Sequence, residues 1–185
     1  MAESVEREIK LRYASLEAAL ESVRALGAAL HSERRLQDDV ILDTPDGGLR
    51  AARSALRVRT ETTQAVLTFK GPPIPGLMKV REEIETGVDD GAVLLEILAR
   101  VGFTPAFGYQ KFRTEYALDD VLITIDETPI GVFVELEGSE EAITTTARRL
   151  GRSPADYVVE SYRTLYLQDC ARRGVTPGVR MHFTA

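Results

Sequence analysis

Charged and apolar side chains alternate near the start of the chain, in the segment Glu6–Leu11. If this segment is a strand, Glu6, Glu8 and Lys10 lie on one face, while Ile9 and Leu11 lie on the other, because side chains along a strand point to its two faces in turn. The charged face must then be directed either to solvent or into a polar interior. Which of the two is true decides the function.

The same alternation recurs in five further segments, at residues 56–59, 67–70, 79–85, 111–115 and 133–137. A single such segment is usually the solvent-facing side of an ordinary sheet. Repetition favours a different arrangement, in which the segments pair in one antiparallel sheet that closes and gathers charges of both signs in its lumen. Buried charges are costly unless they are compensated, so this lumen implies an ionic ligand. Lys and Arg suit phosphate oxygens, and clustered Glu suits a divalent cation.

Helical spacing of apolar residues predicts helices over residues 15–30, 90–101, 139–150 and 153–173. Strands are expected at the start of the chain and over residues 36–43, 57–59, 65–70, 78–85, 109–118, 121–127 and 132–137. Three prolines make residues 71–76 a loop, because proline cannot donate to a strand ladder. Residues 1–174 should form a single domain, followed by a C-terminal tail at 175–185, since no linker divides the chain.

Composition narrows the class of protein. The chain has 185 residues, 44% hydrophobic content and a formal net charge of −6. We expect one cytoplasmic domain without a membrane span or secretory signal, whose acidic outer surface binds neither nucleic acid nor membrane. Cys170 is the single cysteine, and His31 and His182 are far apart in sequence, which argues against a disulfide framework, a zinc site or thiolate catalysis.

Short motifs in the chain follow one another in an order that resembles the CYTH domain, a family also called the triphosphate tunnel metalloenzymes. The motifs are Glu6-x-Glu8-x-Lys10, the strand Asp39–Asp43, Leu56-Arg57-Val58-Arg59, Thr68-Phe69-Lys70, Arg81-x-Glu83-x-Glu85, Lys111-x-Arg113, Asp126-Glu127 and Gly131-x-Phe133-x-Glu135-x-Glu137. The resemblance spans nearly the whole chain. It implies an α+β fold, an eight-stranded antiparallel β tunnel barrel with a polar interior and flanking helices.

The resemblance also implies a role for each charged residue. The implied metal ligands for Mg²⁺ or Mn²⁺ are Glu6, Glu8, Glu135 and Glu137, with Glu83, Glu85 and Asp126 as further ligands or supporting groups. The implied triphosphate-binding residues are Lys10, Arg57, Arg59, Lys70, Lys79, Arg81, Lys111 and Arg113. Candidate catalytic residues are Lys70, Glu8 and Glu135. For each of them the alternative is an ion pair that only stabilises the barrel.

Two features depart from the family pattern. Ile41 stands where a tyrosine is common, so a Tyr–Lys base involving Lys70 is doubtful, and a carboxylate or water activated by the metal is the better candidate base. The chain also contains no tryptophan, which weakens the case for thiamine triphosphate as substrate without excluding it, because Phe or Tyr can also stack.

The function expected first is a metal-dependent triphosphatase, acting on inorganic triphosphate or a related organic triphosphate. A class IV adenylyl cyclase that converts ATP to cyclic AMP and pyrophosphate is the alternative. A non-catalytic sensor of polyphosphate or nucleotide is a third hypothesis. The partner is in each case a small molecule, inorganic triphosphate, thiamine triphosphate or ATP, and the protein is expected to be a monomer or a homodimer.

Overall fold

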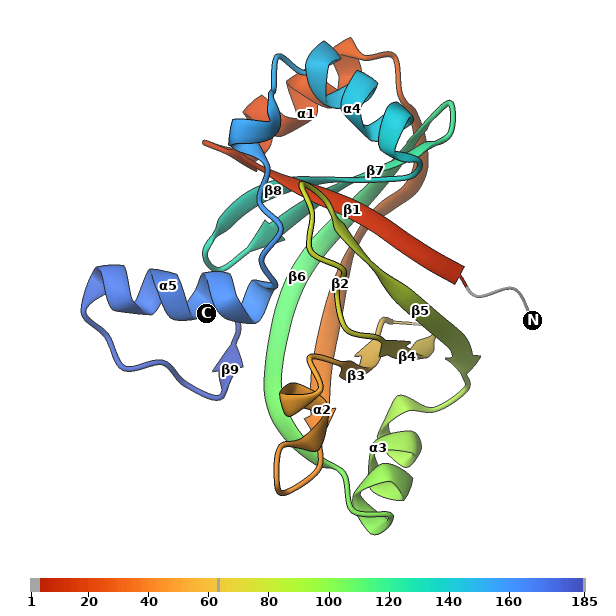
Figure 1. Cartoon of the computed structure of the whole chain (residues 1–185), viewed down its shortest axis with the longest axis vertical. Coiled ribbons are helices and arrows are strands. Elements are labelled where there is room, and N and C mark those ends of the chain that lie inside the picture. Colours follow the sequence, from red (N-terminus) through yellow and green to blue (C-terminus); the bar gives the residue numbers. More distant parts are fainter. Residues whose placement is uncertain (1–3, 63, 185) are drawn as a thin grey trace.

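The computed structural model describes residues 4–62 and 64–184. Its main feature is a ring of eight strands in the order β2-β3-β4-β5-β1-β8-β7-β6, which closes because β6 pairs back onto β2 (Figure 1). Neighbouring strands in the ring are antiparallel. The strands are β1 (Ser4–Tyr13), β2 (Ala29–Asp43), β3 (Ala55–Thr60), β4 (Ala65–Lys70), β5 (Lys79–Val88), β6 (Thr104–Leu118), β7 (Val121–Thr128) and β8 (Gly131–Glu137). The predicted eight-stranded α+β barrel is confirmed.

Helices cover the outside of the ring (Figure 1). The α-helices are α1 (Leu16–Ala25), α2 (Gly48–Ala51), α3 (Gly91–Arg100), α4 (Glu140–Arg149) and α5 (Tyr162–Arg173), with a 3₁₀ turn η1 (Pro154–Asp156) before α5. Helices α1 and α4 lie side by side over β1, β7 and β8, whereas α3 packs against β3 on another side. In the described part of the chain no helix has the length and apolar character that crossing a membrane requires.

The hydrophobic core lies between the ring and α1 and α4, outside the lumen. Ile9 and Leu11 of β1 have no exposed surface, and they pack in one cluster with Val23 of α1 and Ile143 of α4. Their sequence neighbours on the opposite face, such as Lys10, point into the ring. The alternation at the start of the chain therefore separates an apolar outer face from a charged inner one, because the strand has an apolar layer on one side only.

A second, smaller core fixes α5 on the ring. Phe107 of β6 and Phe133 of β8 pack with Tyr162 and Leu165 of α5. Met181 joins this cluster from β9 (Arg180–Met181), which pairs in parallel with β6. The segment 175–185 was predicted as a tail, and its residues 180–181 are part of the sheet, with Met181 only 1% exposed.

Two helix predictions were wrong at one end. The first helix was predicted to run to residue 30, but α1 ends at Ala25, and residue 29 already begins β2. Gly27, with a φ of +78°, adopts the left-handed conformation that ends the helix. Leu30 then pairs with Tyr116 of β6, so strand pairing overrides a local sequence that is compatible with helix.

The last helix was predicted to begin at residues 153–154, but α5 begins at Tyr162, with Ser161 as its N-cap. Ser153 and Asp156 form a capping box around η1 instead. The chain then becomes extended, and the backbone of Val158 both donates to and accepts from the backbone of Lys10, each at 2.9 Å. This bridge beside β1 prevents continuous helix and brings the start of α5 to the lumen.

Candidate functional site

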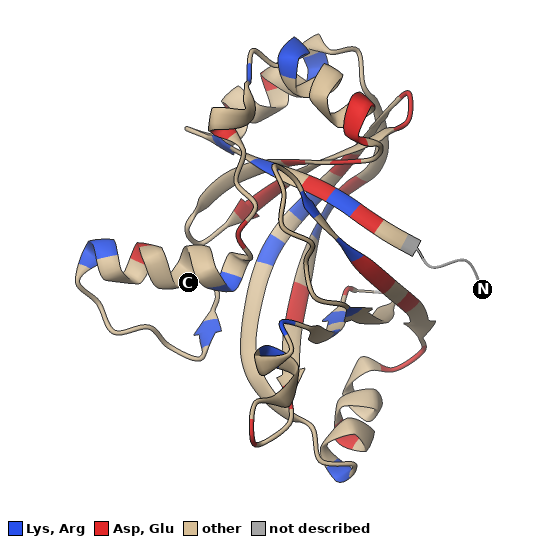
Figure 2. Cartoon of the chain, viewed as in Figure 1, with Lys and Arg blue, Asp and Glu red and all other residues tan. Residues whose placement is uncertain are grey.

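The ring encloses a cavity of about 1030 Å³ that is lined mainly by charged side chains. Figure 2 shows both acidic and basic positions on the strands of the ring, with the two signs alternating along β1. The cavity is lined by all but one of the residues expected in the site, namely Glu6, Glu8, Lys10, Arg57, Arg59, Lys70, Lys79, Arg81, Glu83, Glu85, Lys111, Arg113, Glu135 and Glu137. Asp126 is the exception, since it is fully buried in the wall directly behind Lys111 and Arg113. Ile41, at the position where the family pattern has a tyrosine, also lines the cavity.

Strands β1, β4 and β5 contribute a first cluster, centred on Glu6. The ammonium group of Lys70 lies 2.7 Å from Glu6 and 2.7 Å from Glu83. Arg81 donates to the other oxygen of Glu6 at 3.2 Å. Register explains this arrangement, because Glu6 is paired with Arg81 on β5, and Glu83 is paired with Lys70 on β4.

Glu8 is the centre of the adjoining part of this cluster. It accepts hydrogen bonds from Lys79 at 2.6 Å and from Lys10 at 3.1 Å. Burial alone would raise the pKa of Glu8, but the charges of Lys10 and Lys79 outweigh burial and hold that pKa well below its usual range. Glu8 is therefore ionised in the folded protein, as a carboxylate that binds a cation must be.

Glu137 differs from Glu6, Glu8, Glu83 and Glu135 because no described cation forms an ion pair with it. Glu137 keeps exposed surface at the end of β8, but partial desolvation of its carboxyl, together with the negative charges of Glu6 and Glu8, raises the pKa of Glu137 to about 7. The pKa of Glu83 is likewise raised, by burial and by its contact with Glu6. These four carboxylates repel one another, and this repulsion is only partly offset by the lysines.

Strands β6, β7 and β8 contribute a second cluster, centred on Asp126. Arg113 donates two hydrogen bonds to the two oxygens of Asp126, at 2.7 and 2.6 Å, and Lys111 donates a third at 2.7 Å. Arg113 also donates to Glu135, which lies 3.4 Å from Lys10. Burial opposes ionisation of Asp126, but Arg113 and Lys111 outweigh it and lower the pKa of Asp126 far below its usual value.

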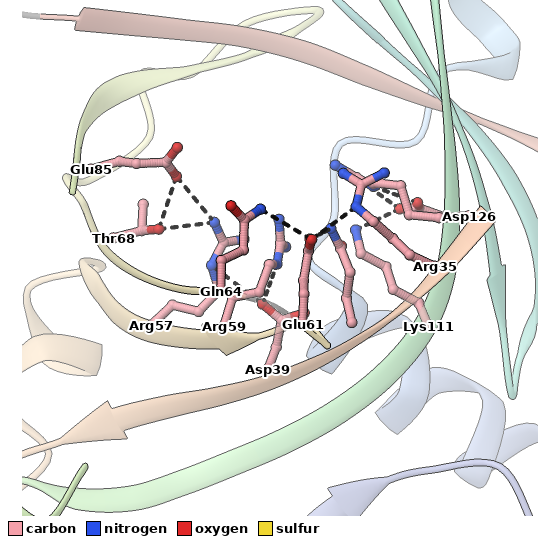
Figure 3. A network of polar contacts seen from close by, with 12 residues as sticks. Arg35, Asp39, Arg57, Arg59, Glu61, Gln64, Thr68, Glu85, Lys111 and Asp126 are labelled. Carbon is pink, nitrogen blue, oxygen red and sulfur yellow. Dashed lines mark hydrogen bonds and ion pairs between the residues drawn. The ribbon is translucent and has the colours of Figure 1, made fainter. Parts of the chain in front are cut away.

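A third cluster lies where β2 meets β3, and Figure 3 shows it together with Lys111 and Asp126. Asp39 has no exposed surface and accepts a hydrogen bond from Arg59 at 3.0 Å, while Arg57 lies 3.4 Å away. Arg57 donates to Thr68, which in turn donates to Glu85. Glu85 was expected as a metal ligand, yet its side chain is 52% exposed, so it lies at the edge of the cavity.

Several residues of a further polar network were missing from the predicted site. Glu61, in the turn between β3 and β4, accepts a hydrogen bond from Arg35 at 3.0 Å (Figure 3). It also accepts one from the buried Gln37 at 2.6 Å. Arg35 also donates to Glu115 at 2.7 Å. The alternation of Arg35, Gln37 and Asp39 is the same signal that identified the other strands. It was overlooked because the strand was predicted to begin at residue 36.

The acidic side of the cavity has the chemistry of a divalent cation site. Mg²⁺ and Mn²⁺ prefer hard oxygen ligands, and a cation among Glu6, Glu8, Glu83 and Glu137 would relieve the repulsion that raises the pKa of Glu137. Within residues 4–62 and 64–184, no three or more His, Cys, Asp or Glu side chains already converge as a metal-binding group. Lys70 and Lys79 occupy the positions next to these carboxylates. Both oxygens of Asp126 are engaged by cationic donors, so Asp126 fits the role of an anchor for Arg113 and Lys111 better than that of a metal ligand.

A closed ring of antiparallel strands around a charged cavity defines this protein as a tunnel-type β-barrel. The model of the CYTH domain family matches residues 4–162, and the chain belongs to this family. A protein of Methanocaldococcus jannaschii named "putative adenylate cyclase" is 32% identical over 136 residues, which cover 73% of this chain and 77% of the relative.

Solved structures share the fold. The structure of a "putative adenylate cyclase" from Vibrio parahaemolyticus has a TM-score of 0.79 at 20% identity, covering 89% of this chain and 98% of that one. A protein from Hippeastrum, described as a "putative adenylyl cyclase" with a dominant triphosphatase activity, has a TM-score of 0.66 at 23% identity and covers 96% of this chain and 100% of its own. At these identities the similarity concerns the fold.

Proposed function

We propose that this protein is a divalent-metal-dependent triphosphatase that binds a triphosphate chain in the charged cavity and hydrolyses it. The observation that carries the proposal is the set of buried cationic groups facing one cavity, among them Lys10, Lys111 and Arg113, each held in place by a carboxylate on its own or a neighbouring strand. Such pairs cost desolvation free energy, and a barrel that needed only stability could fill its centre with apolar side chains. An anionic chain would give these cations a function.

The basic groups can contribute to catalysis by positioning the triphosphate and by neutralising the negative charge of its oxygens. Phosphoryl transfer requires the attacking and leaving oxygens to be in line and the negative charge of the phosphate oxygens to be neutralised. The guanidinium groups of Arg57, Arg59 and Arg113 can each contact two phosphate oxygens, whereas Lys10 and Lys111 act as point charges. No covalent intermediate with the protein is needed.

Mg²⁺ or Mn²⁺ is the proposed cofactor, held by Glu6, Glu8, Glu83 and Glu137. Such an ion would supply positive charge that neutralises the phosphate oxygens and would make a nearby water more acidic. The four carboxylates would hold the cation on the side of the cavity formed by β1, β5 and β8. Glu8 remains a candidate catalytic residue because it is ionised and lies between Lys10 and Lys79.

A second candidate is an adenylyl cyclase, because the relative from Methanocaldococcus jannaschii is named as one. The cavity volume is compatible with this candidate, since about 1030 Å³ lies at the upper end of the roughly 300–1,000 Å³ typical of ligand pockets. A nucleoside would therefore fit beside the triphosphate. The two reactions would use the same basic groups and differ in which phosphorus is attacked.

Product analysis separates the candidates. The protein is incubated with inorganic triphosphate, thiamine triphosphate, ATP or GTP, with Mg²⁺ or Mn²⁺ and with excess EDTA as control, and the products are resolved by ³¹P NMR and chromatography. Metal-dependent release of phosphate from inorganic triphosphate supports the proposal. Cyclic AMP with pyrophosphate from ATP supports the cyclase instead. Tight binding without turnover in every metal would identify a sensor.

A further inference from the structure

Tyr162 was not among the predicted site residues, and it reaches the cavity from outside the ring of strands. It is the first residue of α5, it is 6% exposed and it lines the cavity. Its hydroxyl donates a hydrogen bond of 2.7 Å to Oδ2 of Asp126, the same oxygen that accepts from Lys111 and Arg113. A residue of the C-terminal helix thus takes part in the central ionic cluster.

The ring of Tyr162 also lies close to two lysines of the cavity, one of them Lys111. The ammonium groups of Lys10 and Lys111 lie 5.5 and 5.2 Å from the ring centroid, within the range of cation–π attraction. Phe133 packs edge-on against the ring with centroids 5.5 Å apart, and Tyr109 lies at 5.7 Å. The ring is therefore fixed on its apolar sides, and its position limits where both ammonium groups can lie.

The backbone before Tyr162 is fixed as well. Val158 forms two backbone hydrogen bonds with Lys10, and the Ser161 side chain caps α5 by accepting from the backbone N–H of Thr164. The bridge holds the segment 158–162 against β1 at the level of the second cluster. Simple packing of α5 on the barrel would require only the apolar contacts of the Tyr162 ring, and it would not require a hydroxyl aimed at a fully buried carboxylate.

We infer that Tyr162 is a positioning residue for the triphosphate: through Asp126 and through its ring, it holds Lys111, Arg113 and Lys10 in the arrangement that binds the phosphate chain. This inference rests on the proposed function, because it assumes that these cations bind phosphate. It makes α5 part of the binding apparatus. Charge-assisted hydrogen bonds of this kind restrict the orientation of the Arg113 and Lys111 side chains, both of which line the cavity.

The test compares Tyr162→Phe with Tyr166→Phe, measuring the Kd for inorganic triphosphate by calorimetry without metal and KM and kcat with Mg²⁺. Tyr162→Phe removes the hydroxyl but keeps the ring. Tyr166 lies on the same helix, and its hydroxyl accepts a hydrogen bond from the backbone N–H of Gly178, away from the cavity. Tyr166→Phe therefore controls for the loss of a tyrosine hydroxyl that only anchors α5. We expect Tyr162→Phe to raise Kd and KM about tenfold with a smaller change in kcat, and Tyr166→Phe to leave all three near wild type.

A double-mutant cycle shows whether Tyr162 acts through the cations. If it does, Tyr162→Phe has a smaller effect in a Lys111→Gln background than in the wild type. Additive effects would overturn the inference, as would a Tyr162→Phe protein with wild-type Kd and KM, and both results would leave the triphosphatase proposal intact. A wild-type protein that neither binds nor hydrolyses triphosphate would overturn the inference and the proposed function together.

Discussion

Arg113 and Asp126 are register partners on β6 and β7, and the guanidinium group binds the carboxylate through two parallel hydrogen bonds of 2.7 and 2.6 Å. Asp126 has no exposed surface, and the Arg113 side chain is 11% exposed. A buried pair of this geometry is sensitive to the loss of one partner, because the remaining charge has no solvent to compensate it. This dependence leads to the first prediction.

Asp126→Asn should lower the free energy of unfolding by about 3–5 kcal/mol, because Arg113 and Lys111 would remain buried next to a neutral amide. Urea denaturation followed by circular dichroism measures the change. Glu96→Gln on α3 is the control, since the Glu96–Arg100 pair is largely exposed and should contribute little. Equal stabilities of the Asp126→Asn and wild-type proteins would contradict the second cluster as described.

Glu137→Gln should increase stability at pH 8 and have little effect near pH 4.5. The pKa of Glu137 is raised from 4.5 to about 7, so the folded protein keeps a proton that the unfolded chain has released between these values. Stability therefore falls as the pH rises from about 4.5 to 7, and the cost persists above pH 7. The glutamine variant should lack this part of the pH dependence. Unfolding midpoints of both proteins, measured from pH 4.5 to 8, test the sign of the predicted stability difference. A variant less stable than wild type at pH 8 would refute the prediction.

The same Glu137→Gln substitution should weaken the binding of Mn²⁺, since it removes one of the proposed oxygen ligands. We expect a loss of metal affinity on the order of a hundredfold, with triphosphatase activity lost in parallel at limiting metal. Calorimetric titration with Mn²⁺ after treatment with EDTA measures the affinity. Glu141→Gln on the exposed side of α4 is the matched control. Unchanged Mn²⁺ affinity would remove Glu137 from the proposed metal site.

Ile9→Ala should destabilise the protein by about 2–5 kcal/mol, because Ile9 is fully buried between β1 and the covering helices. Its neighbour Lys10 faces the cavity, and Ile9→Ala should leave the KM for triphosphate unchanged at temperatures where the variant is folded. Unfolding curves and steady-state kinetics on the same sample test both parts. A changed KM with unchanged stability would reverse the assignment of the two faces of β1.

The alternation of charged and apolar residues predicted most strands of the ring, because it depends only on the face of the strand to which each side chain points. Glu6–Lys10 and residues 111–113 could be assigned in this way without knowledge of their partners. The start of β2 could not, because β-bulges between Leu30 and Arg35 interrupt its register with β6. The end of α1 was also missed, since only pairing with the distant Tyr116 shows that Leu30 is in a strand.

Sequence reasoning missed Tyr162 for the same reason, because the role of this residue depends on contacts between distant parts of the chain. Tyr162 contacts Asp126, which is 36 positions earlier in the chain. The apolar residues near Tyr162 in the sequence indicate only a helix that packs on the barrel. The path of residues 157–161 along β1 places its hydroxyl in the cavity, and that path depends on backbone pairing with Lys10. No short motif encodes this contact, so it becomes visible only when the chain is folded.

The binding of inorganic triphosphate to the wild-type and Arg59→Gln proteins, measured by calorimetry without metal so that the triphosphate is not hydrolysed, tests the central claim most directly. Arg59 lines the cavity and pairs with the buried Asp39, and Arg148→Gln on α4 provides the control for an arginine outside the cavity. We predict binding of one triphosphate per chain, weakened at least about tenfold by Arg59→Gln and unaffected by Arg148→Gln. Absence of binding to the wild type, or equal affinities of all three proteins, would contradict the account.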